Sequence, residues 1–177
     1  LTLGVPTNVI IKSLSNIFVK GRMELVGNTP DYSIVIDYAH NAVSLETILK
    51  TLRQYSPKRI VCLFGCGGNR PKMRRFEMGE ISGKYADFSI LTSDNSRFES
   101  PDAIINDILV GMNKTNGQYI AITDRVKAIH YAIDNAQSGD IILITGKGHE
   151  MYQEIEGVKH PFNEAEIICD YLKAKQQ

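Results

Sequence analysis

The alternation of short apolar runs with stretches of helical spacing constrains this chain more than any other feature of its 177 residues. The apolar runs cover residues 59–64, 88–91, 119–122 and 141–145, and the stretches with helical spacing cover 72–85, 102–112 and 125–136. Parallel strands need crossover connections of about a dozen residues or more, and these are usually helices. The sequence therefore predicts an α/β fold with a mostly parallel sheet flanked by helices on both faces.

Further elements flank this alternation on either side. Apolar positions predict helices over residues 4–17, 42–54 and 163–173, and turn residues predict a short N-terminal hairpin over 22–36 and a hairpin-like piece over 151–161. The whole arrangement is Rossmann-like. In sheets of this type, ligands bind beyond the carboxyl ends of the strands.

Composition argues against several classes of partner. The formal net charge is zero, so the chain offers no basic excess for binding nucleic acid. No segment approaches the roughly 18 continuous apolar residues of a membrane span. The three cysteines, Cys62, Cys66 and Cys169, form no disulfide framework, which favours a reducing cytoplasm. No metal site is predicted, because nothing in the sequence completes the pair of Cys62 and Cys66.

Polar and glycine-rich turns follow four of the predicted strands. In chain order they carry Asp37 and His40; Gly65, Gly67, Gly68 and Arg70; Asp94, Asn95 and Arg97; and Gly146, Gly148, His149 and Glu150. Because the carboxyl ends of parallel strands open at one edge of a sheet, we expect these groups to converge there. Arginine matches a carboxylate, and an acidic side chain matches an ammonium group. The set therefore suits a small ligand that carries both charges.

Simpler interpretations remain open for parts of these turns. The glycines also fit ordinary turn geometry, and Ser100 ahead of Pro101 fits the start of a helix. A dinucleotide-binding fingerprint needs glycine where Arg70 stands, which disfavours an NAD-dependent oxidoreductase. No complete catalytic apparatus is visible, so we predict no catalytic residue in this chain.

Six segments carry a resemblance to a known family. They are GRME, DYAHN, FGCGGNR, SDNSR, AIINDIL and GKGHE, at residues 21–24, 37–41, 64–70, 93–97, 103–109 and 146–150. In this order and spacing they resemble the C-terminal domain of a Mur ligase, and within that family the ligases that add meso-diaminopimelate to the peptidoglycan stem peptide. The resemblance implies that residues 1–17 are the tail of a preceding central ATPase domain and that residues 18–177 are the amino-acid-binding domain. The chain also lacks an initial Met, so we expect it to be part of a larger enzyme.

The resemblance also implies roles for individual residues. Diaminopimelate would be held by Arg70, Asp94, Asn95, Arg97, Gly146 and Glu150. Arg70 and Arg97 would take its distal carboxylate, whereas Gly146 and Glu150 would take its distal ammonium group. ATP would be reached by Arg22, Asp37 and His40.

An ATP-dependent amide ligase of peptidoglycan synthesis, monomeric and located in the bacterial cytoplasm, is the activity that the resemblance implies. ATP, Mg²⁺ and the UDP-N-acetylmuramoyl dipeptide would be bound mainly by other domains. The isolated chain is therefore expected to be inactive.

The identity of the added amino acid depends on two neighbouring positions. Ser96 stands where the diaminopimelate-adding ligases have proline, so Arg97 is expected to be less preorganised. Lysine-adding relatives usually lack this arginine, because lysine has no distal carboxylate to neutralise. Arg97 therefore favours diaminopimelate, since a closed site would leave its charge unpaired beside lysine. An L-lysine-adding ligase and a standalone amino-acid-binding module remain alternatives.

Overall fold

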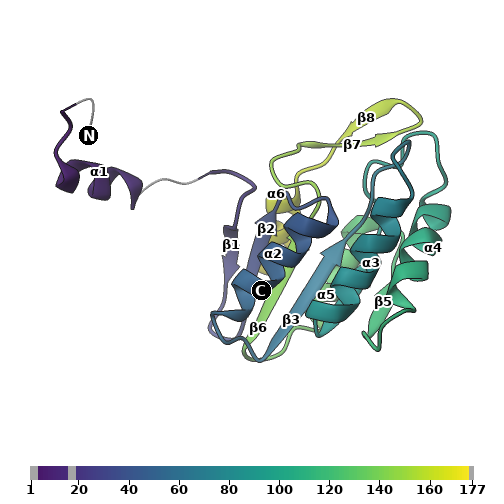
Figure 1. The fold of residues 1–177 in the computed structure, drawn as a ribbon, viewed down its shortest axis with the longest axis horizontal. Helices are drawn as coiled ribbons and strands as arrows, with labels where there is room; N and C mark the ends of the chain where they lie inside the picture. Colours follow the sequence, from purple (N-terminus) through teal and green to yellow (C-terminus); the bar gives the residue numbers. More distant parts are fainter. Residues whose placement is uncertain (1–3, 16–18, 176–177) are drawn as a thin grey trace.

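The computed structural model describes residues 4–15 and 19–175 of the chain. Its centre is a six-stranded sheet in the order β1-β2-β6-β3-β4-β5 (Figure 1). The strands are β1 (Glu24–Asn28), β2 (Ser33–Asp37), β3 (Arg59–Phe64), β4 (Phe88–Leu91), β5 (Tyr119–Ala121) and β6 (Asp140–Thr145). Only the β1–β2 pair is antiparallel, as the predicted N-terminal hairpin requires, and the other neighbours in this sheet run parallel. The predicted α/β fold is confirmed.

The two central strands, β3 and β6, are the most apolar because both of their faces are covered. Apart from Arg59 and Ile141, which are partly exposed, every residue of these two strands is buried. They pair in register, with Cys62 opposite Leu143. Alternate side chains point to opposite faces of a strand, so each strand contributes to two cores.

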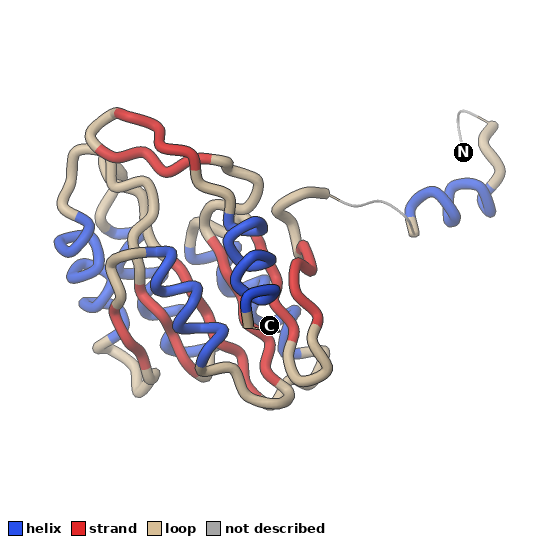
Figure 2. The backbone as a smooth tube through the Cα atoms, turned by 180° about the vertical axis from the view of Figure 1, so that it is seen from behind, coloured by secondary structure: helices blue, strands red, loops and turns tan. Residues whose placement is uncertain are grey.

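Helices cover both faces of the sheet. Their bounds are α2 (Ala42–Arg53), α3 (Met73–Tyr85), α4 (Pro101–Met112), α5 (Arg125–Asp134) and α6 (Glu164–Ala174). The first three pack with Cys62 and Leu143 in one apolar core, and the last two pack with Val61 and Ile142 in the other. Seen from behind, α6 lies in front of the sheet and ends at the C-terminus (Figure 2). None of the described helices combines the length and the apolar character that crossing a bilayer would require.

Polar caps fix the points at which the chain leaves a strand-end turn and becomes helical. Asn41 caps α2 by accepting a hydrogen bond from the Ser44 amide at 3.0 Å. Ser100 caps α4, with Pro101 at its first position, as the sequence predicts. Asp124 caps α5 in the same way. The caps Asn41 and Ser100 anchor the ends of two of the turns that carry the polar residues.

A small second sheet lies beyond the carboxyl ends of the main strands (Figure 1). It consists of β7 (Tyr152–Ile155) and β8 (Val158–Pro161), which form the predicted hairpin. The Arg97 amide donates to the Glu154 carbonyl at 3.0 Å, and the Glu156 amide donates to the Arg97 carbonyl at 2.7 Å. The hairpin is thus joined by its backbone to the turn that follows β4.

Helix α1 (Thr7–Leu14) is the N-terminal element, and none of its residues is buried. It is shorter than the helix predicted over 4–17, whose last two residues lie outside the described residues. The predicted domain boundary between residues 17 and 18 also falls outside them and stays a prediction.

Candidate functional site

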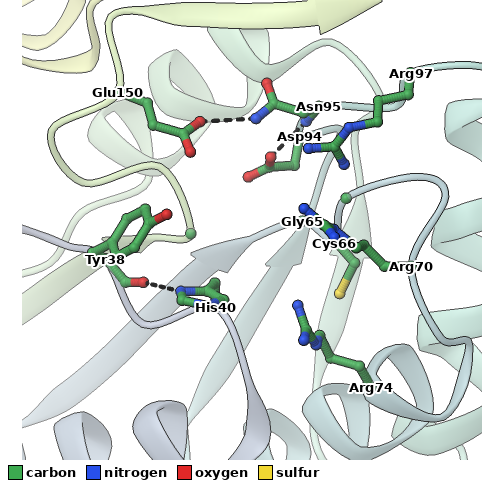
Figure 3. A pocket seen from close by; sticks show the side chains of 12 residues that line it. Tyr38, His40, Gly65, Cys66, Arg70, Arg74, Asp94, Asn95, Arg97 and Glu150 are labelled. Carbon is green, nitrogen blue, oxygen red and sulfur yellow. Dashed lines mark hydrogen bonds between the residues drawn. The ribbon is translucent and has the colours of Figure 1, made fainter.

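A cavity of about 310 Å³ opens at the carboxyl edge of the sheet, where the strand-end turns converge (Figure 3). Its walls are formed by Tyr38, His40, Gly65, Cys66, Gly67, Arg70, Arg74, Asp94, Asn95, Arg97, Gly146 and Glu150. All six residues predicted to hold diaminopimelate are among them, and so is His40. Arg22 and Asp37 are not. The expected convergence of the turns is therefore found in the structure.

Glycines allow these turns to approach each other closely. A Cβ atom on Gly68 would lie only 1.9 Å from the Ser96 carbonyl oxygen, so the turns after β3 and β4 pack backbone against backbone. Gly146 has a φ of +113°, which L side chains rarely adopt, and its Cβ would lie 2.9 Å from a carboxylate oxygen of Asp94. A side chain at either position would distort one wall of the cavity.

The turn after β4 presents an acid and an amide, both buried. One Asp94 oxygen accepts a hydrogen bond from the Asn95 amide at 2.5 Å, and the other is turned toward the cavity (Figure 3). The Asn95 side chain has three partners. Its Nδ2 donates to Glu150 at 2.8 Å, and its Oδ1 accepts from the Glu154 amide and from the Lys147 ammonium, each at 2.9 Å.

Three arginines lie on the opposite side of the cavity from Glu150 and Tyr38 (Figure 3). Arg97 donates to the Gly68 carbonyl at 2.8 Å, and its Nε lies 3.1 Å from a Glu154 oxygen. Arg70 is exposed and Arg74 half-buried. Within residues 4–15 and 19–175, neither of these two side chains forms a hydrogen bond or an ion pair. Both remain available to an anionic ligand.

The buried side chain of Arg125 supports the site from the protein interior. Arg125 Nε lies 2.7 Å from Glu164, and its Nη atoms donate to the carbonyls of Ser93 at 3.1 Å and Thr145 at 2.9 Å. Ser93 and Thr145 directly precede Asp94 and Gly146 in the sequence. Arg125 therefore ties together the two strand ends that carry Asp94 and Gly146, which are neighbours in the cavity wall.

A second buried arginine supports the glycine-rich turn after β3. Arg75 pairs with Glu99 and Asp107, each at 2.8 Å, and also donates to the Gly67 carbonyl at 3.3 Å. Glu99 in turn accepts a hydrogen bond from the Asn69 amide. Hydrogen bonds from Arg75 first, and then from this amide, lower the pKa of Glu99 to about 2. The turn is therefore anchored by a carboxylate that is ionised at neutral pH.

The thiol in the cavity wall is not reactive at neutral pH. Burial, reinforced by the neighbouring Asp94 carboxylate, raises the pKa of Cys66 to about 12. Nucleophilic attack and metal binding both use the thiolate, which this environment suppresses. No cluster of three or more metal-ligating side chains occurs among the residues that the structure describes.

An aromatic group forms the rim next to Glu150. The Arg22 guanidinium lies over the Tyr38 ring, 4.7 Å from its centroid, and the rings of His40 and His149 lie 4.7 and 5.0 Å away. Burial, and then the Glu150 carboxylate, raise the pKa of Tyr38, so its hydroxyl stays protonated. Of the three residues predicted to reach ATP, Arg22 and His40 are exposed at this rim.

Asp37, the third of these residues, has a different environment. It is only 8% exposed, and its two carboxylate oxygens accept hydrogen bonds from the backbone amides of Met23 at 2.9 Å and Ala39 at 2.8 Å. The side chain thus joins the chain just before β1 to the turn after β2. Its predicted contact with ATP stays a prediction.

Sequence reasoning missed several residues of the site. Tyr38, Cys66 and Arg74 line the cavity, and Lys147 is buried directly behind it. Arg74 follows Arg70 by four residues, but Arg70 precedes α3, so helical spacing gives no signal for this pair. The position of Lys147 between Gly146 and Gly148 carries no signal either.

A family model described as Mur ligase, glutamate ligase domain, matches residues 21–148, which is most of the chain. The chain belongs to the Mur ligase family. It corresponds to the C-terminal domain of these enzymes, as the sequence motifs predict. The Rossmann-like fold, the cavity at the strand ends and the family assignment therefore agree.

Individual relatives point to one branch of the Mur ligase family. The chain is 46% identical over 175 residues to a UDP-N-acetylmuramoyl-L-alanyl-D-glutamate–2,6-diaminopimelate ligase of Caldanaerobacter subterraneus subsp. tengcongensis, covering 99% of this chain and 36% of the relative. A ligase of the same name from Clostridioides difficile is 46% identical over 172 residues, covering 96% and 35%. A solved structure with this name has a TM-score of 0.84 at 34% identity, covering 99% and 36%. The chain thus spans about a third of the length of the relatives it matches.

Proposed function

We propose that this chain binds 2,6-diaminopimelate for an ATP-dependent ligase that forms an amide bond in peptidoglycan precursor synthesis. The observation that carries the proposal is the division of charge across the cavity, with three arginines on the side away from Glu150 (Figure 3). Diaminopimelate has an ammonium group and a carboxylate on its distal carbon, so it complements both sides. The names of the relatives support the same substrate.

In this proposal each side of the cavity holds one distal group. Arg70 and Arg97 take the carboxylate, because guanidinium groups bind it in a planar, two-point geometry. Glu150 takes the ammonium group, with Gly146 leaving room beside it. Asp94 and Asn95 complete the polar wall between the two groups. The α-amine is left to reach the reaction centre.

ATP is the cofactor expected of this family, and it supplies the phosphoryl group that activates a carboxylate for amide formation. The rim fits a nucleotide in part: Arg22 offers an exposed cation, and Tyr38 and His40 offer ring faces. Asp37 would act from behind, by fixing the turn that carries these rings. Because the described residues include no cluster of metal ligands, we propose that Mg²⁺ is held mainly by other domains.

We infer no catalytic residue in this chain. The UDP-N-acetylmuramoyl dipeptide, the phosphate groups of ATP and the reacting carboxylate are assigned to other domains of the parent enzyme. The parent is proposed to act as a monomer in the bacterial cytoplasm. The isolated chain is then expected to bind the amino acid weakly and to form no amide bond.

An activity assay on the full-length parent enzyme tests the proposal. With ATP and the UDP-muramoyl dipeptide supplied, meso-diaminopimelate should be strongly preferred to L-lysine. Arg97→Ala should raise KM for diaminopimelate more than for lysine, because only diaminopimelate has a distal carboxylate. Preference for lysine would overturn the proposed substrate. If Arg97→Ala raised KM equally for both amino acids, Arg97 would not bind the distal carboxylate. If the wild-type enzyme turned over neither amino acid, the chain would be better explained as a binding module.

A further inference from the structure

Lys147 is a fully buried cation that stands behind the cavity wall instead of lining it. Its side chain is 0% exposed. The ammonium group lies 2.9 Å from Asn95 Oδ1 and 3.3 Å from Glu150 Oε2. On its other sides are the rings of Tyr152 and Phe162, with centroids at 5.6 and 5.9 Å. The cation is therefore enclosed and has two oxygen partners.

The position of this ammonium group determines which way the Asn95 amide faces. A carboxamide has an accepting oxygen on one side and a donating NH₂ on the other, whereas an ammonium group can only donate. Lys147 therefore requires the Asn95 oxygen on its own side. The Glu154 amide, which also donates to that oxygen at 2.9 Å, imposes the same orientation. The NH₂ group must then point toward Glu150.

Glu150 receives both donors on the same oxygen. Asn95 Nδ2 and Lys147 Nζ each approach Oε2, at 2.8 and 3.3 Å. Within the described part of the chain, no donor forms a hydrogen bond with Oε1. Figure 3 shows this second oxygen on the side of the carboxylate away from Asn95. One oxygen of Glu150 is thus anchored, and the other is left for a ligand.

We propose that Lys147 is a positioning residue for the amino-acid substrate, acting through Asn95 and Glu150. This inference rests on the proposed function, because it assigns the free Glu150 oxygen to the ammonium group of the incoming amino acid. Lys147 itself does not touch the ligand. It fixes the amide, the amide fixes the carboxylate, and the carboxylate presents one oxygen in a set direction. A simpler role, in which Lys147 only balances the charge of Glu150, predicts different results.

The test is steady-state kinetics of the full-length parent enzyme carrying Lys147→Met, which keeps a long apolar side chain and removes the donor. We expect KM for diaminopimelate to rise about tenfold or more, the size of a lost charged hydrogen bond. KM for ATP and kcat at saturating amino acid should stay within about twofold, because neither depends on the direction of Glu150. The control is Lys159→Met, which removes an exposed ammonium group 4.2 Å from the same Tyr152 ring. The control should change none of these constants.

A second variant separates positioning from charge balance. Lys147→Gln is neutral and keeps an NH₂ donor for Asn95 Oδ1 on a side chain one bond shorter, so positioning predicts a KM for diaminopimelate below that of Lys147→Met. Charge balance predicts the same KM for both variants. Equal values, an unchanged KM in Lys147→Met, or a parallel rise in KM for ATP would each overturn the proposal.

A third variant applies if the enzyme does not fold without Lys147. Asn95→Asp keeps an acceptor for Lys147 and removes the donor to Glu150. It should raise KM for diaminopimelate and also lower the melting temperature, because it places a carboxylate oxygen where Asn95 Nδ2 lies 2.8 Å from Glu150. An unchanged KM would overturn the proposal. If the wild-type enzyme prefers lysine, the proposed substrate fails. The same variants are then measured with lysine, which also carries a distal ammonium group, so the role of Lys147 is decided separately.

Discussion

The two sides of the cavity are built on different physical principles. On the side of Glu150, the carboxylate, the Asn95 amide and the buried Lys147 ammonium are linked by hydrogen bonds before any ligand arrives. On the other side, Arg70 is exposed and Arg74 is half-buried. Neither forms a hydrogen bond or an ion pair with the described residues. One side is preorganised, and the other is completed by the carboxylate of its ligand.

The difference follows from what each side must bind. An ammonium group is compact and strongly hydrated, so a site gains by fixing its acceptor in advance. A carboxylate accepts the guanidinium fork from several directions, and flexible arginines can close on it. Arg97 is intermediate in preorganisation. Its backbone is held by the β7 hairpin, while part of its guanidinium still faces the cavity. Preorganisation therefore decreases from Glu150 to Arg97 to Arg70.

The largest expected effect is on folding stability. It comes from Arg125, which holds the strand ends before Asp94 and Gly146. Arg125→Met should lower the free energy of unfolding by about 3–5 kcal/mol, because it leaves Glu164 as a buried, uncompensated charge and releases the carbonyls of Ser93 and Thr145. Urea unfolding of the purified chain measures this loss. The double variant Arg125→Met/Glu164→Leu should recover much of it, since an ion pair replaced by apolar groups costs far less than a broken one. No recovery would show that the carbonyl contacts dominate.

The next effect compares the two sides directly. Glu150→Gln keeps the shape of the side chain and removes its charge, which should cost about 1.5–3 kcal/mol, or roughly 10- to 150-fold in KM of the parent enzyme. The loss should be similar for diaminopimelate and lysine, because both carry a distal ammonium group. Arg70→Met should cost less than about tenfold, and only for diaminopimelate, because its exposed charge is screened by water.

The kinetics of these two variants can also contradict the comparison. If Arg70→Met raised KM for diaminopimelate more than Glu150→Gln did, the arginine side would be the preorganised one. If Arg70→Met impaired lysine as well, its role would not be recognition of the distal carboxylate.

Acid should loosen the arginine side. Arg75 lowers the pKa of Glu99 to about 2 from its ordinary 4.5. A lowered pKa in the folded state means that this pair stabilises the protein fully above about pH 4.5 and loses its contribution as the pH falls toward 2. Glu99→Gln should therefore cost about 1 kcal/mol at pH 7, since Glu99 is partly exposed, and almost nothing near pH 2. Urea midpoints of both proteins across this range measure the convergence, and a constant difference would exclude the pair as its source.

Much of this fold could be predicted from the sequence, because local patterns determined it. The apolar runs of the parallel strands are interrupted by helical spacing, and the caps Ser100 and Asp124 start α4 and α5 where the sequence places them. The cavity could be predicted for the same reason, since parallel strands end at one edge. Arg97 and Glu150, which the sequence predicts to bind the ligand, do lie in the cavity wall, and their contact with a ligand stays a prediction.

What could not be predicted depends on contacts between distant parts of the chain. Nothing near Lys147 shows that its ammonium group meets Asn95, 52 residues earlier, or that Tyr152 and Phe162 enclose it. In the sequence, Asp37 resembles a ligand-binding residue. In the structure, its carboxylate already accepts a hydrogen bond from the Met23 amide, which a turn with a φ of +47° at Met23 brings to it. Long-range packing of this kind leaves no periodic signal in the sequence.

The smallest expected effect concerns Ser96, whose difference from proline suggested a less preorganised Arg97. The structure gives Arg97 another constraint: two backbone hydrogen bonds to the β7 hairpin, at 3.0 and 2.7 Å, hold it at a φ of +51°. The Ser96 amide donates no hydrogen bond to the described residues, so proline would remove none.

Ser96→Pro should then raise the free energy of unfolding by about 0.4–1 kcal/mol, by reducing the conformational entropy of the unfolded chain. KM of the parent enzyme for diaminopimelate should stay within about twofold of the wild-type value, because the β7 hairpin already places Arg97. A fall in KM beyond about fivefold would instead mean that the stiffness of the turn limits Arg97, and that this arginine belongs with the adaptable side of the cavity.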